Sequence, residues 1–65
     1  MIVVYLDVEM ARNKISLNEL SDRINITPSN LSNLKNGKVK SIRFNLLEKL
    51  CRELKCLPGD ILKLE

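Results

Sequence analysis

The chain has 65 residues, of which 45% are hydrophobic and 3% aromatic, and a formal net charge of +3. A chain of this length forms one small domain, here residues 1–65, and its core must be aliphatic because aromatic residues are so few. The hydrophobic content excludes a disordered chain, and no apolar run is long enough to cross a bilayer. Since no signal peptide precedes the domain, we expect a cytoplasmic protein with reduced thiols.

The N-terminal segment predicts a short strand over residues 2–6. Its sequence, IVVYL, is rich in β-branched and aromatic residues, which favour strands. A single strand needs a partner, and the other candidate is the C-terminal segment ILKLE. We expect the two ends to pair antiparallel within the chain, or the N-terminal strand to pair across a dimer.

Two helices are predicted next. The first runs from Asp7, as N-cap, to about Asn13, with Met10 and Ala11 facing the core. Ser16 begins the second, because Glu19 follows it at the spacing of a capping box. The apolar residues of this second helix recur at helical spacing: Leu17, Leu20 and Ile24. Asn25 tolerates positive φ, so a tight turn is expected there.

A third helix begins at Thr27-Pro28, where the hydroxyl caps a free amide and proline suits the first helical position. Only Leu31 and Leu34 are strongly apolar in it, and we expect them to pack with Leu20 and Ile26. The rest of its circumference is polar: Ser29, Asn30, Ser32 and Asn33. Asn36-Gly37 ends this helix.

The remaining residues predict a loop over 38–42, a helix over about 43–54 and a last short helix at the LPGDIL segment. Cys51 has the spacing of a core residue on the long helix. With Cys56 it makes only two cysteines, and the chain has no histidine, so one chain cannot complete a four-ligand zinc site. We therefore expect an all-α, five-helix bundle with a short terminal strand and no metal or other cofactor.

The excess positive charge lies in one segment. Residues 1–34 carry three basic and four acidic residues, and residues 44–65 carry four of each. Between them are four basic residues with no acidic one: Lys35, Lys38, Lys40 and Arg43. A basic patch next to a polar helix is typical of nucleic-acid-binding proteins.

Two short helices joined by a turn predict a helix-turn-helix at about residues 16–36. Asn33 can pair with adenine in a major groove, and Ser29 can bond several base edges. The basic residues of the loop would contact phosphates, and so would the amides that begin the helices at Ser16 and Thr27. These features favour double-stranded DNA as the partner.

The segment SLNELSDRINITPSNLSNLKNGKVKSIRFNLLEKLCRELKCLPGDIL resembles the Cro and phage-repressor type helix-turn-helix domain, also called the xenobiotic-response-element family. Its most specific parts are the Leu20 to Leu34 spacing, LKNGK and the PGDIL ending, and the last of these, with an N-terminal strand, is similar to a small-regulator subgroup of bacteria and their mobile elements. The resemblance covers about residues 7–62. It implies a regulator that binds inverted operator half-sites as a two-fold dimer.

The residues and the resemblance together give two sets of expected contacts. The base-contacting residues are Pro28, Ser29, Asn30 and Asn33, with Pro28 limited to apolar or shape contacts. The phosphate-contacting residues are Ser16, Asn18, Thr27, Asn36, Gly37, Lys38, Lys40 and Arg43. The resemblance also shows departures, because Met10 and Lys35 stand where many members have an arginine–glutamate ion pair, and Ser21 and Asn25 replace an alanine and a glycine.

The sequence therefore predicts a sequence-specific DNA-binding transcriptional regulator, a repressor, that inserts the helix 28–35 into the major groove as a homodimer. The alternative is an antitoxin-like or partner-binding module that uses the apolar N-terminal strand. An enzyme is not expected, because the sequence offers no general base, nucleophile or cofactor loop. No membrane or small-molecule partner is evident.

Overall fold

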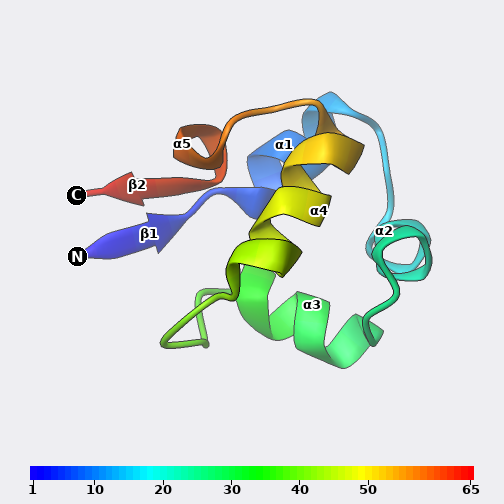
Figure 1. The fold of residues 1–65 in the computed structure, drawn as a ribbon, viewed down its shortest axis with the longest axis horizontal. Coiled ribbons are helices and arrows are strands. Elements are labelled where there is room, and N and C mark those ends of the chain that lie inside the picture. The colour runs from blue at the N-terminus through cyan, green and yellow to red at the C-terminus, as the bar shows by residue number, and fades with distance from the viewer.

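A computed structural model describes all of residues 1–65, and five helices and two strands follow one another along the chain (Figure 1). In order they are β1 (Ile2–Val4), α1 (Leu6–Arg12), α2 (Leu17–Ile24), α3 (Pro28–Lys35), α4 (Phe44–Leu54), α5 (Pro58–Ile61) and β2 (Leu62–Leu64). The predicted five-helix bundle with a terminal strand is confirmed. No helix is long and apolar enough to cross a membrane.

The N-terminal strand pairs within the chain. β1 and β2 are antiparallel, with Ile2 opposite Leu64 and Val4 opposite Leu62. The strand is shorter than the predicted 2–6 because Tyr5 precedes α1 directly, and its carbonyl accepts from the amides of Val8 and Glu9 in that helix. Tyr5 also donates its hydroxyl proton to the carboxylate of Glu65, which raises the pKa of Tyr5 and ties the two ends of the chain together.

The prediction for α1 was wrong at two residues. The helix begins at Leu6, so Asp7 lies inside its first turn and is not the N-cap. Ala11 is exposed, whereas Leu6, Glu9 and Met10 are buried. The earlier start explains the difference, because residues three and four positions after Leu6 share its face and Ala11, five positions on, turns away.

The start and the end of α2 follow from single polar residues. The Ser16 hydroxyl accepts a hydrogen bond from the amide of Glu19 at 3.1 Å. The second half of the predicted capping box is absent, because the Glu19 carboxylate pairs with Arg23 at 2.7 Å. Asn25 ends the helix in the left-handed conformation at φ 60°, as predicted. The chain can therefore reverse direction within three residues and enter α3.

The core is aliphatic. It consists of Leu6, Met10, Leu20, Ile24, Leu31, Leu34, Leu50, Leu54 and Ile61. Ile26 and Cys51, both predicted to pack inward, are half-buried against this cluster. Cys56 packs there too, and burial raises the pKa of its thiol to about 11, so it is protonated at neutral pH. All five helices contribute buried residues to this one core, and the strands pack against it through Val4 and Leu62. The shared core fixes α3 relative to α2 and α4.

Candidate nucleic-acid interface

The capping of α3 places its polar face outward. The Thr27 hydroxyl accepts from the amide of Asn30 at 3.2 Å, and Pro28 occupies the first helical position. Leu31 and Leu34 are 0% and 4% exposed. Because these two leucines hold one side of the helix in the core, the four predicted base-contacting residues are all exposed: Pro28, Ser29, Asn30 and Asn33.

The loop after α3 leaves the helix in a fixed direction. Gly37 has φ 73°, a left-handed conformation that side chains disfavour. The amide of Gly37 donates to the carbonyl of Leu34 at 3.0 Å, and the amide of Lys38 donates to the carbonyl of Asn33 at 2.8 Å. These two hydrogen bonds form a Schellman motif. The loop and α3 consequently lie at the same end of the molecule (Figure 1).

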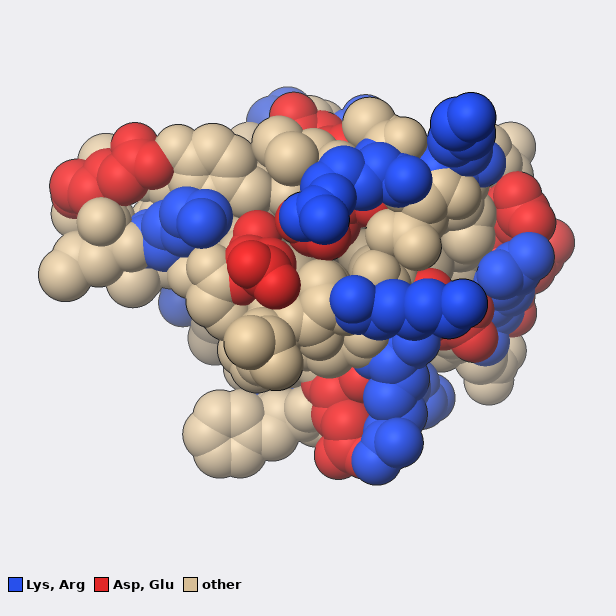
Figure 2. All heavy atoms as spheres, turned by 90° about the horizontal axis from the view of Figure 1, so that it is seen from above, with Lys and Arg blue, Asp and Glu red and all other residues tan.

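The charges at this end have no partners, whereas those elsewhere are often paired. The four basic residues from Lys35 to Arg43 form no ion pair. Arg23 instead pairs with Glu19 and Glu53, and Arg52 pairs with Glu48. On the face seen in Figure 2, the upper one in the view of Figure 1, basic and acidic side chains lie next to one another. Four lysines elsewhere also lack an ion pair, namely Lys14, Lys49, Lys55 and Lys63. What distinguishes residues 35–43 is four unpaired cations in one short segment without an acidic residue, which favours an anionic ligand there.

A hollow joins α3 to the loop and to the start of α4. It has a volume of about 290 Å³ and is lined in part by Asn30, Asn33, Ser41 and Arg43. Two predicted base-contacting residues thus share one surface with a predicted phosphate-contacting residue. Pro28, Ser29 and Lys38 do not line this hollow, and Lys40 lines a different one on the other side of the loop. Asn36 lies just beyond α3 and donates to the Ser32 hydroxyl at 3.4 Å.

The predicted phosphate contacts at the helix starts are exposed, and two of them already act as caps. Ser16 and Thr27 use their hydroxyl oxygens to accept from backbone amides. Each hydroxyl proton stays free to donate, since a hydroxyl is both donor and acceptor. Asn18, in the first turn of α2, is exposed, and its side chain forms no intramolecular hydrogen bond. All three can therefore donate to an oxygen ligand.

The start of α4 is a feature that sequence reasoning missed. Arg43 is its N-cap residue but provides no side-chain cap. The third amide, that of Leu46, donates to Oδ1 of Asn45 at 2.9 Å, which leaves the amides of Phe44 and Asn45 without an intramolecular partner. Amides of this kind attract anions through the helix dipole. The sequence did indicate an uncapped helix start, because residue 43 is an arginine and not one of the preferred N-cap residues serine, threonine, aspartate and asparagine.

Comparison with known proteins supplies the family of this fold and surface. Residues 5–65 match the family of Cro/C1-type helix-turn-helix DNA-binding domains. The chain belongs to this family. A relative in Bacillus subtilis (strain 168), named "Uncharacterized HTH-type transcriptional regulator YozG", is 53% identical over 62 residues, which is 95% of this chain and 74% of the relative.

The departures from the Cro/C1-type pattern are accommodated by the fold. Ser21, where alanine is usual, is 1% exposed, and its hydroxyl donates to the carbonyl of Asn18 at 2.8 Å. A buried hydroxyl costs little when it is hydrogen-bonded. Met10, where the usual ion pair would have its arginine, is buried in the aliphatic core. Packing therefore holds α1 against the helix-turn-helix without that ion pair.

Proposed function

We propose that the protein is a sequence-specific, double-stranded DNA-binding transcriptional regulator that represses by occupying its operator. The observation that carries this proposal is the exposed polar side of α3, followed directly along the chain by a segment of unpaired cations, in a chain of a DNA-binding family. The printed name of the Bacillus subtilis relative supports the regulatory role. The whole chain, residues 1–65, would act as one DNA-binding module, in the cytoplasm of a bacterial cell.

In this proposal α3 enters the major groove. Asn33 pairs with adenine, and Ser29 and Asn30 form hydrogen bonds with neighbouring base edges. Amide and hydroxyl groups can do so because they both donate and accept hydrogen bonds, as the base edges do. Pro28 has no N–H and contributes apolar contact alone. The hollow shared by Asn30, Asn33 and Arg43 supports an arrangement in which base and phosphate contacts lie next to one another.

Phosphates would bind on both sides of α3. On one side are the helix starts with Ser16, Asn18 and Thr27, and on the other is the loop with Asn36, Gly37, Lys38, Lys40 and Arg43. Phosphate contacts fix the position of a protein on the duplex, and base contacts select the sequence. Salt should therefore weaken binding steeply, since each neutralised phosphate releases bound counterions.

The proposed DNA-bound state is a homodimer on an inverted repeat. A two-fold dimer places its recognition helices in successive major grooves about one helical turn apart. The competing function, binding of a different protein through the N-terminal strand, is favoured by the exposure of Ile2, which is 61%. It is weakened by the pairing of that strand with β2, which uses one of its two edges.

The test is selection of binding sites from a random duplex pool, with affinity followed against salt. We expect an enriched inverted repeat whose half-sites are about ten base pairs apart, together with a linear fall of log affinity with log salt. A pool without enrichment and only weak, salt-sensitive binding would contradict a sequence-specific regulator. That result would favour the partner-binding function.

A further inference from the structure

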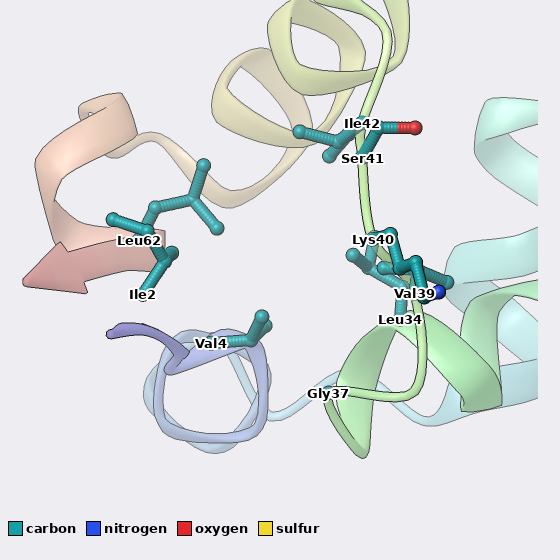
Figure 3. Close-up of a pocket in the computed structure, with 9 residues that line it drawn as sticks. All are labelled: Ile2, Val4, Leu34, Gly37, Val39, Lys40, Ser41, Ile42 and Leu62. Carbon is teal, nitrogen blue, oxygen red and sulfur yellow. The ribbon is translucent and has the colours of Figure 1, made fainter.

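A second hollow lies on the other side of the loop, between it and the two-stranded sheet (Figure 3). Its volume is about 300 Å³ and six of its nine lining residues are hydrophobic, so it is an apolar groove. The six are Ile2, Val4, Leu34, Val39, Ile42 and Leu62. In Figure 3 the side chains of Val4 and Leu62 extend from the strands toward the loop, whereas the Lys40 nitrogen and the Ser41 oxygen point away from the sheet.

The apolar surface continues from this groove to the end of the sheet. Ile2 pairs with Leu64, and residues directly opposite one another in an antiparallel pair lie on the same face. Leu64 therefore extends the row formed by Val4, Leu62 and Ile2. Met1, Ile2 and Leu64 are 85%, 61% and 79% exposed. They form a tip of apolar side chains where the two strands project from the helices (Figure 1). The charged chain ends lie beside it, and the Met1 ammonium donates to the main-chain oxygen of Glu65.

We infer that the groove and the tip together form the interface with a second copy of this chain, the tip of each copy filling the groove of the other. The inference rests on the proposed function, because it identifies the surface that makes the dimer. A two-fold interface uses the same surface on both copies and must be self-complementary. This face meets that condition, since the hollow and the projecting residues that can fill it are adjacent on one chain.

The character of the surface favours a second copy over other occupants. An interface of standard size covers about 800 Å² per partner, and the chain exposes 4716 Å² in all. A second copy could cover Met1 and Leu64 as well as the groove, whereas a small ligand held in the groove would leave these two exposed side chains in water. No charged group points into the groove in Figure 3, so nothing there selects a charged ligand or a charged segment of another protein.

The position of the groove also connects dimer formation to DNA binding. Val39 and Ile42 line its loop side, and Gly37 and Lys40 of the same loop are proposed phosphate contacts. A second copy packed on Val39 and Ile42 would hold this loop in one position. Each process then favours the other by the same factor, as linkage requires. An inverted repeat should accordingly promote dimer formation more than a single half-site does.

Two matched variants test the interface by sedimentation equilibrium of the full chain. Ile2→Asp places a carboxylate between the groove and the tip and should weaken self-association at least about tenfold, because a buried unpaired charge is strongly unfavourable. Leu57→Asp makes the same change at an apolar residue that is 71% exposed and does not line the groove. Residue 57 is the N-cap of α5, where aspartate is favoured, so this control should fold and associate normally.

A direct measurement accompanies the variants. Mixing ¹³C-labelled with unlabelled wild-type chain should give intermolecular NOEs between the methyl groups of Leu64 and Val39. A wild-type chain that stays monomeric at NMR concentrations, or an Ile2→Asp chain that associates like the wild type, would overturn the inference. Binding of each variant to a duplex with one half-site tests the DNA-binding function separately. Ile2→Asp should retain it, since Ile2 is not among the proposed DNA contacts.

Discussion

The end of the molecule formed by α3 and the loop differs from the side formed by α2 and α4 in what its exposed charges contact. On α2 and α4 the arginines pair with carboxylates: Arg23 with Glu19 and Glu53, and Arg52 with Glu48. On the loop, Lys38 and Lys40 have no such partner. Exposed ion pairs contribute little to stability, so the first arrangement is ordinary solvated surface. The second leaves charge uncompensated, which is the condition for binding a polyanion.

The largest effect is expected within α3 itself, where its two sides should respond differently. Leu31→Ala should lower the free energy of unfolding by about 2–5 kcal/mol, because it empties a fully buried site. Asn33→Ala, on the exposed side, should change it by less than about 0.5 kcal/mol. Urea unfolding of both variants measures the difference. Equal losses would show that Asn33 supports the fold and is not free to contact DNA.

Asn33→Ala should have its main effect on sequence recognition. Affinity for the selected operator should fall by about 1–3 kcal/mol, the value of a bidentate base contact. Affinity for random duplex should not change, because phosphate contacts remain. Fluorescence anisotropy with both duplexes measures the two losses in parallel. If both duplexes lose affinity equally, Asn33 does not read the base sequence.

Removing one positive charge should change the salt dependence of DNA binding when the charge lies on the loop, but not when it lies on α4. Lys38→Ala should weaken binding to all sequences and reduce the slope of log affinity against log salt by about one. The matched control is Arg52→Ala, which also removes one positive charge, but from the paired side. Its slope should stay at the wild-type value. An unchanged slope for Lys38→Ala, or equal changes in both variants, would remove the distinction between the regions.

A smaller effect is expected from the backbone of the loop. Gly37→Ala should lower stability by about 1–2 kcal/mol, because the left-handed conformation is costly for a residue with a Cβ atom. No atom lies within 4 Å of the added Cβ, so the cost is conformational and not steric. Gly59→Ala is the control, since it has equal space and no positive φ. Thermal unfolding compares them, and equal stability of the two variants would contradict this account of the loop.

The parts of the fold predicted correctly are those set by local chemistry. Thr27 with Pro28 specified the start of α3, Asn25 the turn before it, and Gly37 the exit into the loop. Capping and positive φ depend on a few neighbouring residues, so they can be predicted from sequence.

The start of α1 was missed because no capping side chain specifies it. The terminal β1–β2 pairing joins residues more than 55 positions apart, and the sequence could not decide between pairing within the chain and pairing across a dimer. The candidate site divides in the same way. Residue types on α3 and the loop predicted a DNA-binding surface there, and the arginine at the N-cap of α4 was a local signal that the prediction overlooked. The groove beside the sheet, by contrast, depends on how distant elements pack.

The central claim is that α3 and the loop form the DNA-binding surface while the paired charges of α2 and α4 do not. The most direct measurement is a titration of ¹⁵N-labelled protein with the selected operator duplex, following every backbone amide by NMR. We predict that the large shifts fall within residues 16–18 and 27–44, with little change on the exposed face of α4 around Arg52. Shifts centred on α4 or spread evenly over all charged surfaces would contradict the account.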